Sequence, residues 1–128
     1  METGQNQRAD TIMIVDDEVF FRGLLRDILT KEGFNVIAEA ANGADAVALY
    51  RQHKPDLVLM DIYMPEQSGI ESTRDIMGID PQAKILICSG VGYDQDLDAA
   101  LQAGARGVVY KPFFDEEVLE NIKKALAG

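Results

Sequence analysis

The chain has 128 residues, 47% of them hydrophobic and 27% charged, which is the size and balance of one globular domain. Its net charge of −10, from 12 basic and 22 acidic residues without a basic stripe, argues against direct DNA binding. No apolar run approaches the ~20 residues that span a bilayer, and the polar start does not resemble a signal peptide, so we expect a cytoplasmic protein with no membrane contact.

Short apolar runs alternate with helical patterns along the chain. Residues 1–10 are polar and aperiodic, so we expect a disordered N-terminal tail followed by one folded domain over 11–128. The predicted strands lie at 11–15, 36–38, 57–60, 85–88 and 107–110. Apolar side chains at helical spacing predict helices between Phe21 and Gly33, between Asn42 and Pro55, from Ser68 through Met77, from Asp94 to Ala103, and from Asp115 to the end of the chain.

Local signals mark several ends of these helices. Asn42 followed by Asp45 offers a side-chain cap, and Ser68 with Glu71 forms the pattern of a capping box. Gly33 stands where a helix commonly ends in a left-handed residue.

Five strand–helix units in strict alternation favour a parallel sheet with helices on both faces. Right-handed crossovers leave few topologies, and the leading one is an open, doubly wound, five-stranded α/β sheet with five helices. We expect the flavodoxin-like strand order 2-1-3-4-5, in which the reversal lies between the first and third strands. A closed eight-unit barrel needs far more chain. Ligands bind such open sheets outside the carboxyl ends of the strands.

Charged residues stand at the carboxyl ends of three predicted strands. Asp16 and Asp17 follow the first strand, Asp61 follows the third and Lys111 follows the fifth. The adjacent acids alone could simply cap the first helix. Three carboxylates and one ammonium in one pocket, however, favour a hard divalent cation such as Mg²⁺, which takes oxygen ligands and adds phosphate oxygens. The sequence therefore indicates a metal-assisted phosphoryl site.

Four short motifs lie at these strand ends. They are Ile14-Val15-Asp16-Asp17 with Arg22, Met60-Asp61-Ile62-Tyr63-Met64-Pro65 with Gly69, Ser89-Gly90, and Tyr110-Lys111-Pro112-Phe113. With these motifs, the chain from Ile12 onward resembles the receiver domain of a two-component response regulator, of the stand-alone chemotaxis-regulator type. The resemblance implies a phosphorylation-controlled binding module, not a turnover enzyme, in which the Lys111–Pro112 peptide bond is cis.

The resemblance also implies roles for individual residues. Asp61 is expected to accept a phosphoryl group from the phosphohistidine of a sensor histidine kinase or phosphotransfer protein, or from a small acyl phosphate. Asp16, Asp17, Asp61 and the backbone carbonyl of Tyr63 are expected to hold Mg²⁺, for which Mn²⁺ could substitute. Lys111 is expected to neutralise charge on the transferring oxygens.

The remaining expected roles concern the switch. The Ser89 hydroxyl is expected to bind a phosphoryl oxygen after transfer and to draw its loop inward. The family pattern has an aromatic residue three positions before the lysine, where this chain has Val108. Strand alternation puts Tyr110 on the same side as Val108, so Tyr110 could replace that aromatic residue, and a packing role for both is an equal alternative.

The lifetime of the phosphorylated state should depend on two further positions. The ring of Tyr63 is expected to shield the acyl phosphate, and Val91 has no polar group to orient an attacking water. We therefore expect slow self-hydrolysis.

Partner surfaces are only partly indicated by the sequence. The resemblance places the downstream target on the face formed by the fourth helix, the fifth strand and the fifth helix. Phe20 lies off the apolar stripe of the first helix, where it could contact the kinase or pack against a neighbouring loop.

Two other classes of protein share this architecture. A phosphohydrolase with an aspartate nucleophile normally has its nucleophile and acid two residues apart, whereas Asp16 and Asp17 are adjacent. A flavin-binding electron carrier needs a hydroxyl- and glycine-rich loop after the first strand. A receiver that only binds partners, without phosphorylation, remains an alternative.

Overall fold

The computed structural model describes residues 10–90 and 94–128, and strands alternate with helices throughout these residues. The strands are β1 (Thr11–Val15), β2 (Asn35–Ala40), β3 (Leu57–Asp61), β4 (Ile85–Gly90) and β5 (Gly107–Lys111). The helices are α1 (Val19–Lys31), α2 (Gly43–His53), α3 (Gly69–Ile79), α4 (Asp94–Ala103) and α5 (Asp115–Ala127). Within the described residues, no helix is both long and apolar enough to cross a membrane. The tail expected over 1–10 lies outside these residues apart from Asp10, and it stays a prediction.

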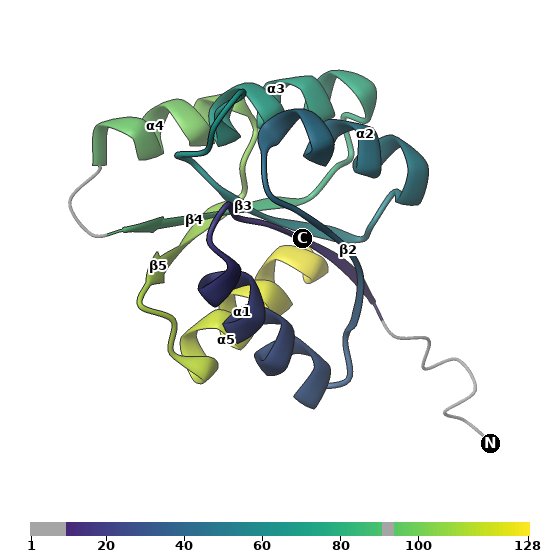
Figure 1. Ribbon diagram of the computed structural model, residues 1–128, viewed down its shortest axis with the longest axis vertical. Helices are drawn as coiled ribbons and strands as arrows, with labels where there is room; N and C mark the ends of the chain where they lie inside the picture. Colours follow the sequence, from purple (N-terminus) through teal and green to yellow (C-terminus); the bar gives the residue numbers. More distant parts are fainter. Residues whose placement is uncertain (1–9, 91–93) are drawn as a thin grey trace.

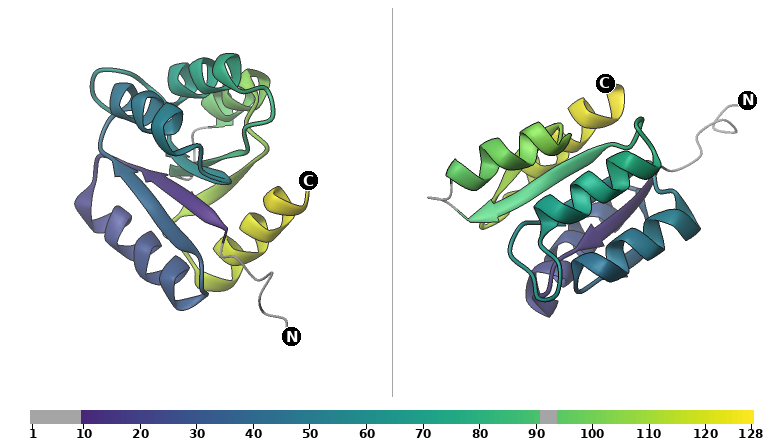
Figure 2. Two further views of the ribbon diagram at one scale, coloured as in Figure 1. Left: turned by 90° about the vertical axis from the view of Figure 1, so that its right-hand side faces the viewer. Right: turned by 90° about the horizontal axis from the view of Figure 1, so that it is seen from above.

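The strands form one parallel sheet in the order β2-β1-β3-β4-β5, which confirms the predicted topology. Figure 1 shows α2, α3 and α4 over one face of the sheet and α1 and α5 over the other. The same three layers can be followed in the two further views of Figure 2. Because every helix returns the chain to the same end of the sheet, all carboxyl strand ends meet at one edge.

Each face of the sheet has its own apolar core. Met13 and Val15 of β1 pack with side chains of α2, α3 and α4, whereas Ile12 and Ile14 pack with α1 and α5. β3 divides its side chains between the two faces in the same way. Burial of each large apolar side chain contributes about 1.5–3 kcal/mol. The doubly covered middle strands can therefore carry charged residues at their ends without loss of the fold.

Several strands extend further than the sequence predicted. β3 includes Asp61, β5 includes Lys111 and β4 continues to Gly90. Backbone pairing with the neighbouring strand explains the difference, because Asp61 pairs with Cys88 and Lys111 pairs with Gly90 beyond the last apolar residues. Two charged side chains thus project from paired strand ends and not from loops. The peptide bond between Lys111 and Pro112 is cis, as the resemblance implied.

The predicted helix ends are confirmed at three positions. The side chain of Asn42 accepts a hydrogen bond from the Asp45 N–H at 2.8 Å. Ser68 and Glu71 form the reciprocal capping box, with bonds of 3.2 and 3.4 Å. Gly33 has a φ of +91°, the left-handed conformation that favours glycine at a helix end.

Gly69, the first residue of α3, lies directly against the end of β3. A Cβ atom at this position would overlap the carbonyl oxygen of Asp61. A Cβ atom at Gly78, in the same helix, would meet no atom within 4 Å. The close approach of α3 to Asp61 therefore requires glycine at position 69.

We expect Gly69→Ala to lower the free energy of unfolding by about 2–4 kcal/mol, because backbone atoms must move apart. The matched control Gly78→Ala should raise the stability by up to about 1 kcal/mol, since alanine has a higher helix propensity than glycine. Urea unfolding followed by circular dichroism measures both changes. A Gly69→Ala variant as stable as the wild type would contradict the close contact.

Candidate functional site

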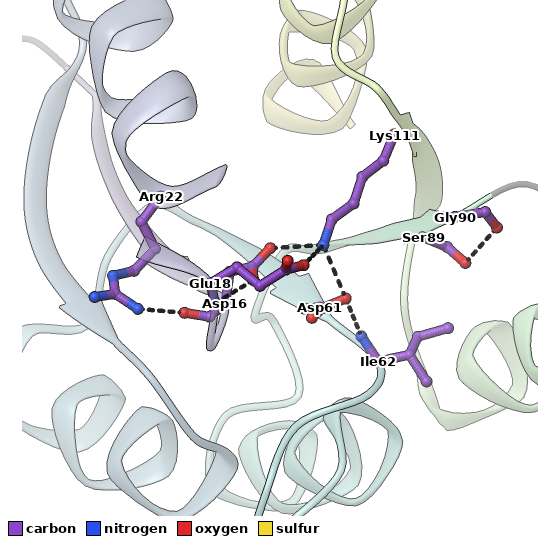
Figure 3. Close-up of polar contacts among 8 residues, drawn as sticks. All are labelled: Asp16, Glu18, Arg22, Asp61, Ile62, Ser89, Gly90 and Lys111. Carbon is purple, nitrogen blue, oxygen red and sulfur yellow. Dashed lines mark hydrogen bonds and ion pairs between the residues drawn. The ribbon is translucent and has the colours of Figure 1, made fainter. Parts of the chain in front are cut away.

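Three charged side chains from distant parts of the chain meet at the carboxyl edge of the sheet. Figure 3 shows Asp16 after β1, Asp61 at the end of β3 and Lys111 at the end of β5 pointing toward one another. The Nζ atom of Lys111 lies 2.9 Å from Asp16 Oδ2 and 3.6 Å from Asp61 Oδ1. The strand order predicted this meeting, and the structure brings the three residues together.

Asp16 is held by its backbone as well as by its side chain. Only 1% of it is exposed, its N–H donates to the Ala40 carbonyl at 3.1 Å, and its own carbonyl accepts from Arg22 Nη1 at 2.6 Å. Asp16 Oδ1 accepts a hydrogen bond from the Glu18 N–H at 2.9 Å. Glu18 is the N-cap residue of α1 and makes no side-chain capping bond. Asp16 therefore fixes the turn that leads into α1 and does not itself occupy the capping position.

The carboxylate of Asp61 occupies an unfavourable place for a negative charge. Asp61 is 6% exposed, and burial together with the charges of Asp16 and Asp17 raises its pKa to about 7. The Lys111 ammonium and a hydrogen bond from the Ile62 N–H at 3.0 Å oppose this rise in the pKa without cancelling it. A cation among these carboxylates would relieve the repulsion.

The ammonium of Lys111 faces carboxylates and one aromatic ring. Besides the two aspartates, Nζ lies 3.6 Å from Glu18 Oε1 and 4.3 Å from the centroid of the Phe21 ring. Burial lowers the pKa of Lys111, but the neighbouring carboxylates outweigh burial and leave the pKa above its ordinary value. Lys111 is therefore positively charged at neutral pH.

A cluster of carboxylates lies beside this contact. Asp16, Asp17 and Glu18 each offer one carboxylate oxygen, and these oxygens lie within 4.8 Å of one another. Asp16 is buried, whereas Asp17 and Glu18 are exposed. Hard oxygen donors that remain open to water fit Mg²⁺, which keeps several waters in its coordination shell. Asp61 lies outside this cluster, and the Lys111 ammonium contacts both.

Ser89, Tyr63 and Val91 were also named from the sequence. The buried Ser89 hydroxyl donates to the Gly90 carbonyl at 3.1 Å, and Figure 3 shows it turned toward Gly90 and not toward Asp61. Tyr63 lies in the segment after β3 and is 50% exposed. Val91 falls outside the described residues.

The two positions discussed for the aromatic switch lie on one side of β5. Val108 packs against the apolar core beneath α2, α3 and α4, whereas Val109 belongs to the opposite core. Tyr110 is 38% exposed. Val108 thus has the packing role that the sequence allowed, and a switch role for Tyr110 stays a prediction.

Two neighbours of Lys111 were not predicted from the sequence. Glu18 directly follows the acidic pair, and this adjacency was a usable signal that its carboxylate belongs to the same cluster. Phe21 fitted the apolar stripe of the first helix, so nothing in the sequence set it apart from a core residue. Phe20 is mostly exposed, and its ring contacts Phe21.

An acidic pair after β1, an aspartate at the end of β3 and a lysine at the end of β5, on a sheet of this topology, define a receiver domain. Comparison with known sequences agrees. The chain belongs to the response regulator receiver domain family, whose sequence profile matches residues 12–123.

Individual relatives are similar over almost their whole length. The chain is 51% identical over 118 residues to the chemotaxis protein CheY of Bacillus subtilis, covering 92% of this chain and 98% of that one. It is 47% identical to CheY of Thermotoga maritima, covering 88% and 94%. The CheX–CheY–BeF3–Mg²⁺ complex from Borrelia burgdorferi contains a similar structure, with a TM-score of 0.86, 37% identity and coverage of 90% and 87%. A CheY-like receiver protein from Methanospirillum hungatei has a TM-score of 0.87 at 28% identity, covering 94% and 95%.

In metal-free buffer at pH 8, we expect Asp61→Asn to be more stable than the wild type by about 1–3 kcal/mol. The folded state holds the Asp61 proton up to about pH 7, whereas an unfolded aspartate loses it near its ordinary value of 3.8. The stability that this group contributes is therefore complete only below about pH 4 and is lost as the pH rises through about 7.

Urea unfolding in EDTA between pH 4 and pH 8 measures this difference in stability. The difference in the free energy of unfolding between Asp61→Asn and the wild type should become smaller toward pH 4. Mg²⁺ should reduce the difference at pH 8 by stabilising the folded wild type. Asp27→Asn is the control, because Asp27 of α1 is exposed and water solvates its charge. A difference in stability that stays constant across this pH range would rule out ionisation of Asp61 as its cause.

Proposed function

We propose that Asp61 accepts a phosphoryl group and that this modification switches the affinity of the protein for a downstream partner. The donor is the phosphohistidine of a sensor histidine kinase or phosphotransfer protein, or a small acyl phosphate. The observation that carries the proposal is a buried strand-end carboxylate 3.6 Å from the Lys111 ammonium, beside two further acids. Membership of the receiver family supports it, since phosphorylation on aspartate is typical of that family.

The proposed transfer is a displacement at phosphorus. A carboxylate oxygen of Asp61 forms a bond to phosphorus while the bond from phosphorus to the donor breaks. The electron pair of that bond leaves with the imidazole nitrogen of the kinase, or with the carboxylate oxygen of an acyl phosphate. Lys111 neutralises part of the charge on the transferring oxygens. The protein carries out its own phosphorylation by positioning and electrostatics, and it is a signalling module and not a turnover enzyme.

The proposed ligands of Mg²⁺ are Asp16, Asp17, Asp61 and the backbone carbonyl of Tyr63. Bound there, the cation would supply further neutralisation of the phosphoryl oxygens. Mn²⁺ also prefers oxygen ligands and could substitute. Support comes from the carboxylate cluster after β1 and from the raised pKa of Asp61, which burial and the charges of Asp16 and Asp17 together cause. The similar complex from B. burgdorferi contains Mg²⁺.

The proposed switch involves Ser89. Its hydroxyl, which donates to the Gly90 carbonyl, would donate instead to a phosphoryl oxygen on Asp61. An added phosphoryl group brings negative charge and acceptor oxygens, so it favours the loop arrangement that supplies this donor. The end of β4 that carries Ser89 would then move toward Asp61, whereas the loop after it lies outside the described residues.

The proposed partners are a sensor kinase or phosphotransfer protein and a downstream target that binds the face formed by α4, β5 and α5. That face includes two exposed large side chains, Leu101 and Tyr110. The B. burgdorferi CheY binds another protein, CheX, which supports protein recognition as the output. The net charge of −10 disfavours direct DNA binding. The cytoplasmic location stays a prediction.

After incubation with acetyl phosphate and Mg²⁺, we expect the intact mass of the wild type to increase by one phosphoryl group. Asp61→Asn should show no increase, and Lys111→Met should react about 100-fold more slowly because it loses charge stabilisation. Lys123→Met, an exposed lysine of α5, is the control and should react like the wild type. Phosphorylation of Asp61→Asn at the wild-type rate would contradict the assignment of Asp61 as the phosphoryl acceptor.

We expect the double variant Tyr63→Asn with Val91→Glu to lose its phosphoryl group about tenfold faster than the wild type or more. Removal of the shielding ring admits water, and the new polar groups can orient it for attack. The decay of the phosphorylated mass after removal of acetyl phosphate measures the rate, with each single variant as control. A lifetime equal to that of the wild type would refute the shielding role.

A further inference from the structure

Lys111 has a neighbour that carries no formal charge. The ring of Phe21, in the first turn of α1, is half-buried, and its centroid lies 4.3 Å from Lys111 Nζ. The face of an aromatic ring attracts a cation electrostatically when the cation lies within about 6 Å of the centroid. Phe21 therefore contacts the charged end of Lys111 as well as the apolar surroundings of α1.

Two further aromatic rings contact Phe21. Phe20 lies at 5.4 Å between centroids with an interplanar angle of 69°, and Phe113 lies at 5.6 Å with an angle of 87°. Phe113 follows Lys111 by two residues, in the segment between β5 and α5. These edge-to-face contacts are the favoured arrangement of aromatic pairs. They restrict rotation of the Phe21 ring and join α1 to the segment that carries Lys111.

The ring differs from the other neighbours of Lys111 in one chemical respect. Asp16 and Glu18 attract the ammonium with oxygens that are also suited to binding a cation. A cation bound by these oxygens would weaken their hold on Lys111. The ring of Phe21 offers no oxygen ligand, so its attraction for the ammonium does not depend on the state of the carboxylates.

We propose that Phe21 is a positioning residue for phosphoryl transfer, whose ring holds the Lys111 ammonium beside Asp61 when the neighbouring carboxylates bind a cation. The inference rests on the proposed function, because it assigns Phe21 a part in the reaction at Asp61. It also makes a separate statement about the metal-free protein, in which the ring face is in contact with the ammonium. A side chain that only filled space would need the volume of the ring and not its electron distribution.

The first test compares the rates of phosphorylation by acetyl phosphate in Mg²⁺ over a range of acetyl phosphate concentrations. Phe21→Leu should lower the maximal rate constant about three- to tenfold with little change in the half-saturating concentration of acetyl phosphate. Phe21→Tyr keeps an aromatic ring, so its maximal rate constant should equal that of the wild type. Phe114→Leu is the matched control, because Phe114 is exposed and neighbours Phe113. It should react like the wild type. Urea unfolding establishes that each variant is folded.

The second test separates the electrons of the ring from its volume. Phenylalanines with an increasing number of ring fluorines, incorporated at position 21, should lower the rate constant progressively, because fluorine withdraws charge from the ring face. In metal-free protein, NMR should show the methylene protons next to Lys111 Nζ shielded by the ring, and Phe21→Leu should abolish this shielding.

A rate that does not change with fluorination, or an absence of shielding at Lys111, would overturn the positioning role. Failure of the wild type itself to be phosphorylated on Asp61 is a different result, since it would refute the proposed function. The NMR measurement would still decide whether the ring holds the ammonium.

Discussion

The site depends on an imbalance of charge that the protein cannot relieve by itself. Asp16, Asp17 and Asp61 lie at one edge of the sheet, where burial and the two neighbouring acids raise the pKa of Asp61, and Lys111 offsets only part of this rise. Charges repel more strongly where water is excluded. Additional positive charge is therefore bound favourably, and it makes the approach of an anionic phosphoryl group possible. The same imbalance underlies both the Mg²⁺ site and the phosphoryl chemistry proposed for Asp61.

The sheet makes this imbalance possible. Asp61 and Lys111 belong to paired strand ends, so backbone hydrogen bonds of the ladder fix where each side chain begins. Arg22 holds the turn after β1 in place. It donates a hydrogen bond to the Asp16 carbonyl and forms an ion pair with Glu39 at 3.5 Å. Two separate apolar cores supply the stability that this arrangement needs. Repelling charges are tolerated because the elements that carry them cannot move apart.

A doubly wound parallel sheet and the meeting of charged strand ends could be predicted from the sequence, because both follow from regular alternation of apolar runs and helical patterns. The particular strand order needed analogy with known sheets as well, since alternation alone fits more than one order. The exact ends of the strands could not be predicted. Asp61 and Lys111 belong to strands because they pair with neighbouring strands, whereas their charged side chains do not favour a strand. Side-chain contacts were harder still. Phe21 fitted an apolar stripe equally well with or without an ammonium beside it, and the hydrogen bond of Ser89 depends on a single torsion angle. Contacts that depend on side-chain rotamers cannot be predicted from the periodicity of a sequence.

Gly69 joins the reacting strand to a helix without an intervening side chain. Its N–H donates to the Ile62 carbonyl at 2.8 Å, and its Cα faces the carbonyl of Asp61. Densely packed backbone has little room to absorb a displacement. The main chain of Asp61 therefore cannot move toward α3 unless α3 moves with it. Because α3 packs against both α2 and α4, the end of β3 is joined by direct packing to the helical layer on that face.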